Sequence, residues 1–407
     1  LMNSGMYAYV TGMDKNDMSE ASFDRYARKK NQLLYYEEGV TATVMVAKNA
    51  GEKENLFLAL DGKVDASTAG DIQTQLLVGH VPMLYARTTS DVVVVGYATG
   101  MTVGAASLHH VRSLTAVEIE KAVIEASKLF TPYNNDPLSN PKVKIVIGDG
   151  RNFLQVTPDK YDVIISEPPN PWMTIAANLF TREYFQMGKD HLKPGGIFCG
   201  WVQLYGLPPN LVRAVLRTFG EVFPHISVYM PIPYADLVLL GSERPLEPDI
   251  PLMAEKMKDP RVAADLARIG IHSVPELLTY HVLDDAGARA FAGRGPINTD
   301  DNAMIEFQAP LSLYAGTRMP NAKALLPYLS DPLKGAVGLP GDPAEAADMY
   351  ARLGEAFFDR RIAGRAVAAF NAAQRLHPTE ERAERMLQIQ KWFEDRIEEL
   401  RRQELGG

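Results

Sequence analysis

The four consecutive valines at 92–95, followed by Gly96, Gly100 and Gly104, constrain the fold more than any other part of the chain. A continuous β-branched run is typical of a strand that is buried on both faces, as in a parallel sheet covered by helices. Glycines directly after such a strand let the backbone turn sharply and approach a ligand closely. The segment therefore predicts a strand, a tight turn that faces a ligand, and a helix that starts at the turn.

Strand and helix patterns continue to alternate after this segment. Repeated alternation predicts a doubly wound α/β sheet whose strands are mostly parallel. The last two apolar runs, 225–230 and 237–240, are expected to pair antiparallel. The predicted strands are 92–95, 114–117, 143–147, 163–165 and 197–204, and the predicted helices include 120–130, 181–192 and 210–219.

The segments that flank the alternating region have different residue patterns. Short β-rich runs over 31–66, with a turn signal at Asp61-Gly62, predict a small β subdomain. A helix is expected from Asp71 to His80, ending before Pro82. Further on, residues 243–330 predict short helices and loops, and residues 332–343 predict a Pro/Gly-rich linker. Residues 369–378 resemble the second helix of a tetratricopeptide repeat, and a plain helical hairpin is the alternative.

Composition excludes several classes of function. The formal net charge of −8 argues against a nucleic-acid binder that works by neutralising phosphates. The single cysteine, Cys199, excludes an intrachain disulfide and a multi-cysteine zinc site, and the histidines form no metal-binding pattern, so no metal is expected. No apolar run reaches the roughly 18–20 residues that span a bilayer. The basic cluster of Arg25, Arg28, Lys29 and Lys30 is expected to be a solvated helix face, with a phosphate or membrane contact as the alternative.

Three carboxylates follow successive predicted strands, at the sheet edge where open α/β sheets bind ligands. Glu118 lies 22 residues after Gly96, a position from which a carboxylate can accept both ribose hydroxyls. Asp149, between two glycines, can accept from an adenine amino group. Glu167 precedes a loop stiffened by three prolines, which suits a reacting group. The alternatives are an ordinary tight turn with a surface glutamate, an Asx turn and a solvated loop acid.

In order and spacing, these motifs resemble the spermidine/spermine synthase family, the polyamine aminopropyltransferases. The resemblance covers roughly residues 31–245. Other segments are closer to a bacterial branch in which this domain follows transmembrane helices, which would account for the first residue being Leu1. The family motifs include 35–39, 60–62, 96–104, 117–119, 148–150, 161–165, 179–181 and 192–196, and those of the bacterial branch are 3–7, 166–172 and 298–302.

The resemblance implies a class I methyltransferase-like doubly wound sheet with a small N-terminal β subdomain and a C-terminal helical, tetratricopeptide-like extension. The corresponding domains are 1–80, 81–330 and 331–407. The family transfers an aminopropyl group from decarboxylated S-adenosylmethionine to an amine and releases methylthioadenosine. By this resemblance the catalytic residues are Glu167, Asn170 and Tyr234, and the donor is held by Asp65, Gln75, Gly96, Thr99, Gly100, Glu118, Ile119, Asp149 and Gly150.

Several positions depart from the family pattern. Thr99 and Asn170 stand where the family has aspartates, and Asp65 stands where it has a glutamine. Thr74 and Leu76 replace a tyrosine and a glutamate that help to hold the acceptor, and Gln75 lies between them. We therefore expect the donor nucleoside site to be preserved and the acceptor site to be depleted of anionic and hydrogen-bonding groups.

Three functions remain open at this point. The first is aminopropyl transfer to an external amine. The second is intramolecular cyclisation of the donor, in which methylthioadenosine is released without a polyamine. The third is a non-catalytic nucleoside sensor, and ordinary methyl transfer is a weaker fourth.

The donor also has an alternative. Thr99 removes a negative charge, so S-adenosylmethionine itself is an alternative donor.

The cellular setting follows only from the resemblance. The expected partners are a small amine or none, a transmembrane segment of the same protein, and a second copy in a homodimer, but no nucleic acid. The expected location is the cytoplasmic face of the bacterial inner membrane, with the cytoplasm as the alternative.

Overall fold

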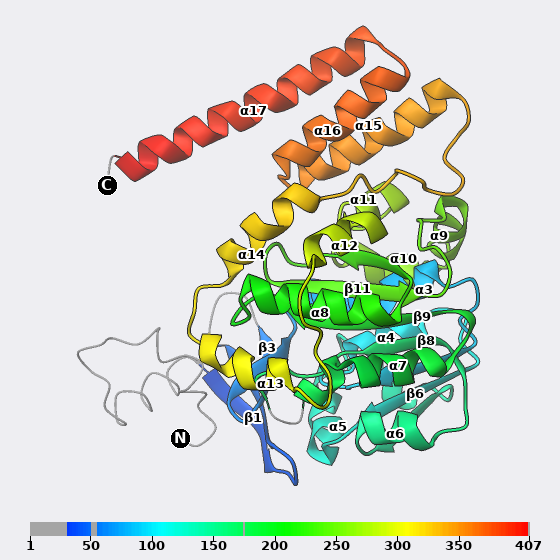
Figure 1. Cartoon of the computed structure of the whole chain (residues 1–407), viewed down its shortest axis with the longest axis vertical. Helices are drawn as coiled ribbons and strands as arrows, with labels where there is room; N and C mark the ends of the chain where they lie inside the picture. The colour runs from blue at the N-terminus through cyan, green and yellow to red at the C-terminus, as the bar shows by residue number, and fades with distance from the viewer. Residues whose placement is uncertain (1–30, 50–54, 174–175, 406–407) are drawn as a thin grey trace.

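The structure is a computed structural model that describes residues 31–49, 55–173 and 176–405. Within these ranges the chain forms a four-stranded sheet, an eight-stranded sheet and a set of helices around them (Figure 1). The basic cluster at 25–30 and the motif at 3–7 lie outside the described residues.

The small sheet is antiparallel in the order β1-β2-β3-β4, as expected for a β subdomain. A two-residue turn joins its last two strands. Asp61 and Gly62 in that turn have φ values of 48° and 81°, and a hairpin turn that matches strand twist requires positive φ at both positions. The strands are β1 (Asn31–Glu38), β2 (Thr43–Asn49), β3 (Leu56–Leu60) and β4 (Lys63–Ser67).

The large sheet confirms the predicted doubly wound arrangement. Its order is β12-β10-β11-β9-β8-β5-β6-β7, and the five strands from β9 to β7 run parallel. β10 and β11 pair antiparallel, also as predicted. The chain leaves β5 toward β6 on one side and returns to β8 on the other, so the topological switch point lies beside β5. The strands are β5 (Asp91–Val95), β6 (Ser113–Glu118), β7 (Val143–Ile147), β8 (Tyr161–Ser166), β9 (Leu192–Gln203), β10 (His225–Tyr229), β11 (Asp236–Ser242) and β12 (His281–Leu283).

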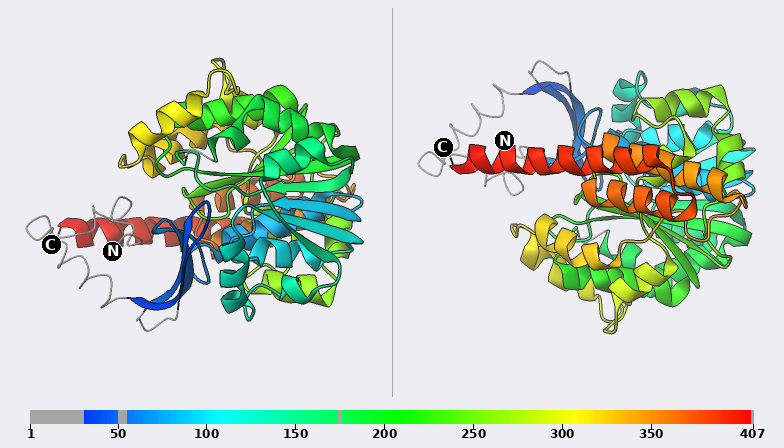
Figure 2. Two further views of the ribbon diagram at one scale, coloured as in Figure 1. Left: turned by 90° about the horizontal axis from the view of Figure 1, so that it is seen from below. Right: turned by 90° about the horizontal axis from the view of Figure 1, so that it is seen from above.

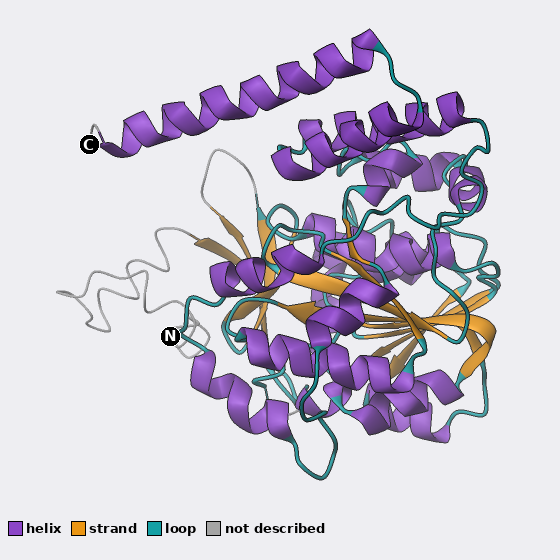
Figure 3. Cartoon of the chain, turned by 45° about the horizontal axis from the view of Figure 1, so that its top comes forward, coloured by secondary structure: helices purple, strands orange, loops and turns teal. Residues whose placement is uncertain are grey.

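Helices cover both faces of this sheet, as Figure 3 shows by secondary structure. Val92 and Val94 of β5 belong to one apolar core and Val93 to the other, so alternate side chains of one strand pack against opposite helical layers. The first layer contains α3 (Ile72–Tyr85), α4 (Met101–Ser107) and α5 (Lys121–Ser127), and the second contains α6 (Gly150–Val156), α7 (Arg182–Asp190) and α8 (Pro209–Val222).

The helix predicted to end before Pro82 is longer than expected. α3 continues through Pro82 to Tyr85 and so crosses the predicted domain boundary at residues 80 and 81. A proline inside a helix leaves the carbonyl four residues earlier without its usual donor. That carbonyl belongs to Val78, and the buried Cys199 thiol of β9 donates to it at 3.9 Å. The helix therefore passes the proline because a neighbouring strand supplies a partner.

The chain after β11 forms helices that the sequence predicted only in outline. α15 and α16 pack side by side at one end of the molecule, and α17 packs against them through Trp392 and Phe393 on Phe358 before it extends past them (Figure 1). The predicted helical C-terminal region is confirmed, whereas its assignment to a tetratricopeptide repeat stays a prediction. These elements are α9 (Ile250–Lys256), α10 (Pro260–Ala267), α11 (Val274–Leu278), α12 (Asp285–Ala292), α13 (Met304–Gln308), α14 (Arg318–Leu325), α15 (Pro343–Asp359), α16 (Ala363–Leu376) and α17 (Glu380–Leu405).

A helix must be both long and apolar to span a membrane. Among residues 31–49, 55–173 and 176–405, no helix is both long and apolar enough to cross a bilayer.

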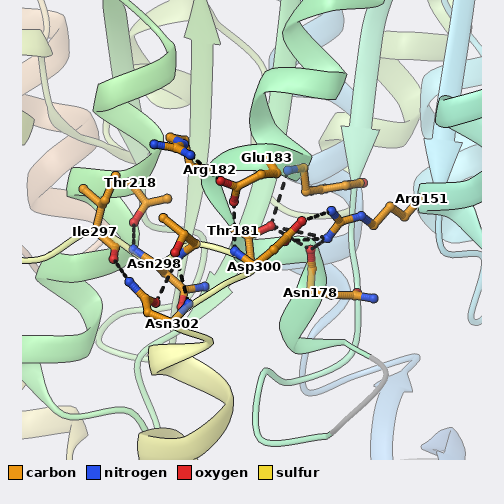
Figure 4. A network of polar contacts seen from close by, with 12 residues as sticks. Arg151, Asn178, Thr181, Arg182, Glu183, Thr218, Ile297, Asn298, Asp300 and Asn302 are labelled. Atoms are coloured by element: carbon orange, nitrogen blue, oxygen red, sulfur yellow. Dashed lines mark hydrogen bonds and ion pairs between the residues drawn. The ribbon is translucent and has the colours of Figure 1, made fainter.

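The motif at 298–302 ties the second helical layer together (Figure 4). Asn298 is almost fully buried, its side-chain amide donates to the Phe180 carbonyl at 3.0 Å, and its oxygen accepts from the Ile305 amide at 3.1 Å. Asp300 forms an ion pair with Arg151 at the start of α6 and accepts from it at 2.9 Å. The segment thus fixes the helix that follows β7 and holds the N-terminal end of α7 in register.

We expect Asn298→Ala to lower the free energy of unfolding by about 1–3 kcal/mol, because two buried backbone groups lose their partners. Chemical denaturation measures this loss. Gln155→Ala, on the exposed face of α6 in the same domain, is the control and should change stability by less than about 0.5 kcal/mol. An Asn298 variant as stable as the parent would show that these bonds contribute nothing.

Candidate active site

A cavity of about 910 Å³ lies at the carboxyl ends of β5, β6 and β8, beside the topological switch point. The small sheet closes it on one side through β4, and the segment before α14 borders it on another. Both views of Figure 2 place the small sheet and the α13–α14 region at the same end of the molecule. The cavity is thus formed where three separate parts of the chain meet.

The glycine loop leaves no room for side chains at this edge. Gly96 has φ = 96°, and a Cβ there would stand 2.5 Å from the Glu167 carbonyl oxygen. A Cβ on Gly150 would stand 2.3 Å from the Val95 side chain. Both positions therefore require glycine, and both line the cavity as predicted.

Glu118 ends β6 and lines the part of the cavity where the sequence predicts a nucleoside, and it is 7% exposed. Its two carboxylate oxygens accept from the backbone amides of Tyr97 at 3.0 Å and Glu120 at 2.9 Å. Burial raises the pKa of Glu118, and these amides oppose the rise. Its remaining acceptor capacity faces the cavity, where it can bind a pair of hydroxyl donors.

Asp149 and Ile119 line the same end of the cavity. Asp149 caps α6 by accepting from the Asn152 amide at 2.6 Å, so its orientation is fixed. Ile119 is 37% exposed and offers an apolar surface next to Glu118. The predicted nucleoside residues at the ends of β6 and β7 are therefore brought together.

Glu120 fastens the small sheet to this end of the cavity. It accepts from the backbone amide of Thr41 at 2.8 Å and from the Thr41 hydroxyl at 2.9 Å. A Cβ on Gly39 would stand 2.3 Å from the Glu120 carboxyl carbon, so any larger residue there would have to displace this carboxylate from Thr41. The small sheet therefore forms a wall of the cavity.

Glu167 follows β8 and is partly buried inside the cavity. Desolvation raises the pKa of Glu167 to about 7, and the nearby charges of Asp71 and Asp236 act in the same direction. Its Oε2 lies 2.6 Å from the hydroxyl of Thr102 in α4. A carboxyl group with a pKa near 7 can both take up and release a proton at neutral pH.

The Thr102 hydroxyl lies between two acceptors but carries one proton. It is 3.0 Å from the Gln75 carbonyl oxygen and 2.6 Å from Glu167. If Thr102 donates to the carbonyl, Glu167 must be protonated to donate to Thr102; if Glu167 is ionised, Thr102 donates to it. The geometry therefore accommodates Glu167 in either protonation state.

Two further carboxylates, which the sequence does not predict as site residues, line the cavity. Asp236 begins β11 and accepts from the Thr74 hydroxyl at 2.6 Å, and Asp71 precedes α3. Desolvation raises the pKa of Asp71 to about 6 and that of Asp236 above its usual value. We call Asp71, Glu167 and Asp236 the acidic cluster. Around Thr74, where the sequence predicts few anionic groups, the cavity therefore contains carboxylates.

The wall opposite the nucleoside end also contains cationic side chains. Lys63 forms an ion pair with Asp65 at 2.5 Å, and both line the cavity. Arg318 of α14 lines its exposed rim, with its guanidinium 5.5 Å from the centre of the Tyr205 ring. No ion pair joins Arg318 to a carboxylate of the described chain.

Several predicted site residues do not line this cavity. Tyr234 is 42% exposed and faces a second cavity, because the loop before β11 turns it away, and Tyr205 lines this region instead. Asn170 is buried behind the wall and donates to the Tyr205 hydroxyl at 3.3 Å. Leu76 belongs to the apolar core. The leucine that stands here in place of the family's glutamate therefore packs in the core and does not line the cavity.

Two residues of the glycine loop also differ from their predicted roles. Thr99 is fully buried, and its hydroxyl donates to Gln75 at 2.5 Å rather than facing the cavity. Gly100 has φ = 79° and caps α4, so it shapes the turn without lining the cavity. Gln75 does line the cavity, as predicted, and its amide donates to the Ser67 carbonyl at 2.9 Å.

Comparisons with known proteins match the central part of the chain. A model of the spermine/spermidine synthase domain matches residues 72–242. The spermidine synthase of Dictyostelium discoideum is 30% identical over 210 residues, which cover 51% of this chain and 73% of that protein. The polyamine aminopropyltransferase of Buchnera aphidicola is 27% identical over 201 residues, 49% of this chain and 69% of that protein.

Solved structures give a weaker likeness. A spermidine synthase from Thermotoga maritima aligns with a TM-score of 0.47 at 23% identity, over 52% of this chain and 73% of that chain. A probable spermidine synthase from Corynebacterium glutamicum aligns with a TM-score of 0.49 at 18% identity, over 66% of this chain and 97% of that chain.

Proposed function

Because the chain belongs to the spermine/spermidine synthase family, a family of transferases, we propose that it transfers an aminopropyl group from decarboxylated S-adenosylmethionine to a polyamine. The observation that carries the proposal is one cavity with two chemically different ends. Glu118 and Asp149 suit a nucleoside at one end, and the acidic cluster suits a cationic amine at the other.

In this reaction the amine nitrogen attacks the carbon bonded to the sulfonium sulfur. A nitrogen–carbon bond forms, the carbon–sulfur bond breaks with its electron pair going to sulfur, and methylthioadenosine leaves. An aliphatic amine with a pKa near ~10 is neutral about once in a thousand molecules at pH 7, which costs roughly 4 kcal/mol. Glu167, whose side chain lines the cavity, would take the proton that the attacking nitrogen gives up.

The acidic cluster favours an external acceptor over intramolecular cyclisation. Cyclisation was inferred from an acceptor region without charged partners, but Asp71 and Asp236 line that region. A diamine carries two positive charges, and carboxylates inside the cavity offset the cost of removing them from water. The case for cyclisation therefore loses its premise, and membership of a transferase family argues against a non-catalytic sensor.

The test is product release from purified, polyamine-free protein supplied with decarboxylated donor alone, with putrescine, or with spermidine. We expect methylthioadenosine and a longer polyamine in equal amounts, and only when an acceptor is present, as measured by mass spectrometry. Methylthioadenosine released with donor alone, together with a small cyclic amine, would instead establish cyclisation.

Arg318 supports a second candidate, in which S-adenosylmethionine itself is the donor. The Arg318 guanidinium makes no ion pair within the described residues, although its charge acts on Asp236, and it suits a carboxylate, which only the undecarboxylated donor carries. The same assay with S-adenosylmethionine should then give a carboxylated product, and Arg318→Met should reduce its formation while leaving use of the decarboxylated donor intact.

We expect Glu118→Ala to weaken methylthioadenosine binding by about 1.5–3 kcal/mol, the scale of hydrogen bonds to a charged group. Calorimetry measures the change, and Glu125→Ala, on the exposed surface of α5, is the matched control. Unchanged affinity in a folded Glu118 variant would remove this residue from the nucleoside site.

The pH profile of kcat/KM should have an acid limb near pH 7. The active base is the ionised form of Glu167, whose pKa is raised to about 7, so kcat/KM should fall about tenfold per unit below that value. Thr102→Val removes a donor that favours the ionised form and should move the limb to higher pH. A profile flat from pH 5 to 8 would contradict a titrating base here.

Other parts of the sequence prediction remain predictions. These are the fusion to transmembrane helices, the inner-membrane location, the homodimer and the domain boundary at 330/331, whereas the boundary at 80/81 falls inside α3.

A further inference from the structure

A second cavity, of about 800 Å³, lies between the core domain and the C-terminal helices α15 and α16. Its walls are mostly apolar, with Leu325 and Leu329 on the core side and Leu353, Phe357 and Ala369 on the helical side. This volume is in the range of sites that enclose a small organic ligand. The cavity lies outside the segment that matches the family, residues 72–242, apart from the loop around Tyr234.

Four arginines line this apolar cavity: Arg360, Arg361, Arg365 and Arg375. No ion pair joins any of the four to a carboxylate in the described ranges, 31–49, 55–173 and 176–405. Asp331 is the one acidic residue among the described cavity residues, and its carboxylate accepts from the Tyr350 hydroxyl at 2.8 Å. A chain with a net charge of −8 thus gathers four guanidinium groups against one carboxylate around one cavity.

Two of the arginines are held in place by neutral groups. Arg365 donates to the carbonyls of His281 and Ser330, and Arg360 donates to the Thr279 hydroxyl at 2.9 Å. The Arg360 guanidinium also lies 3.4 Å from the centre of the Tyr280 ring. Burial lowers the pKa of Arg365 to about 10, the neighbouring charge of Arg360 acts in the same direction, and the charge of Asp331 opposes the shift only in part. An anion in the cavity would supply the missing charge.

We propose that this cavity binds an amphipathic anion, an apolar chain or ring system that carries a carboxylate or phosphate group. The leucine and phenylalanine walls take the apolar part, and the guanidinium groups bind the anionic head, which arginine recognises in a bidentate way. The shape and charge of the cavity suit neither a bare inorganic anion nor a cationic amphiphile.

The loop before β11 connects this cavity with the active site. Met230, Pro233 and Tyr234 line the second cavity, whereas Ile232, Ala235 and Asp236 line the first. Neighbouring residues of one short loop thus face the two cavities, and Asp236 belongs to the acidic cluster. We therefore expect occupancy of the second cavity to change the KM for the acceptor.

The binding test uses laurate as the probe and isothermal calorimetry as the measurement, so it does not depend on the proposed activity. Laurate below its micellar concentration should bind the 407-residue chain with one site per chain. Arg361→Met combined with Arg375→Met, both exposed at the rim, should weaken binding at least tenfold. Arg396→Met on α17, away from the cavity, is the control and should leave binding unchanged.

Two further probes separate the sources of binding energy. Dodecyltrimethylammonium, with a similar chain and the opposite charge, and inorganic phosphate, with no chain, should each bind at least tenfold more weakly than laurate. Equal binding of either, or laurate binding that survives the double substitution, would overturn the site. Binding of laurate without any change in acceptor KM would overturn the connection through the loop.

Discussion

Glu167→Gln is expected to lower turnover by roughly 10²–10⁴ while leaving methylthioadenosine affinity unchanged. Glutamine has nearly the same shape and still accepts from Thr102, but it cannot take a proton from the attacking amine. Steady-state kinetics with donor and polyamine measures turnover, and calorimetry measures nucleoside binding on the same preparation. The two measurements separate loss of proton transfer from loss of the site.

The control for this substitution is Glu125→Gln, which makes the same chemical change on the exposed surface of α5. It should leave both quantities unchanged. Normal turnover in Glu167→Gln would remove Glu167 from the mechanism, and would leave Asp71 or Asp236 as the remaining carboxylates of the cluster that could accept the proton.

The arrangement of the large sheet could be predicted because each of its strands can be recognised from its own residues. Continuous apolar runs such as Val92–Val95 and Val163–Ile165 are buried on both faces, and each ends where the turn begins. The length of α3 could not be predicted in this way. Pro82 ends a helix by local rules, and the thiol that compensates for it belongs to Cys199, far along the chain.

The two ends of the active-site cavity also differ in how well the sequence predicts their residues. Glu118 and Asp149 follow consecutive strands, so the parallel sheet itself brings them together, and a sequence shows that order directly. The role expected for Tyr234 failed because matching a position in the chain does not fix the direction of a side chain. The loop before β11 places Tyr234 and Asp236 in different cavities although they are two residues apart.

Asp71 and Asp236 were missed for a related reason. The first follows the small sheet, and the second begins a strand that reaches the cavity only through antiparallel pairing with β9. Neither lies in a recognisable motif. The loss of acidic and polar groups at Thr74 and Leu76 was visible in the sequence, whereas these carboxylates became visible only when the chain was folded.

Asp236→Asn should therefore raise the KM for the polyamine acceptor by about 30- to 1000-fold, corresponding to roughly 2–4 kcal/mol. Asparagine can still accept from Thr74, so the substitution removes the charge and keeps the hydrogen bond. Kinetics at saturating donor measures KM.

Asp259→Asn, at the N-cap of α10 and outside the residues that line the cavity, is the control; asparagine also caps helices, so this variant should behave like the parent protein. The outcome also discriminates between the two ways of generating methylthioadenosine. If the donor's own amine were the nucleophile, no second substrate would need the charge of Asp236 for binding, and the variant would lose little beyond donor affinity. A large loss confined to the acceptor, with methylthioadenosine affinity intact, is the pattern that only an external polyamine produces.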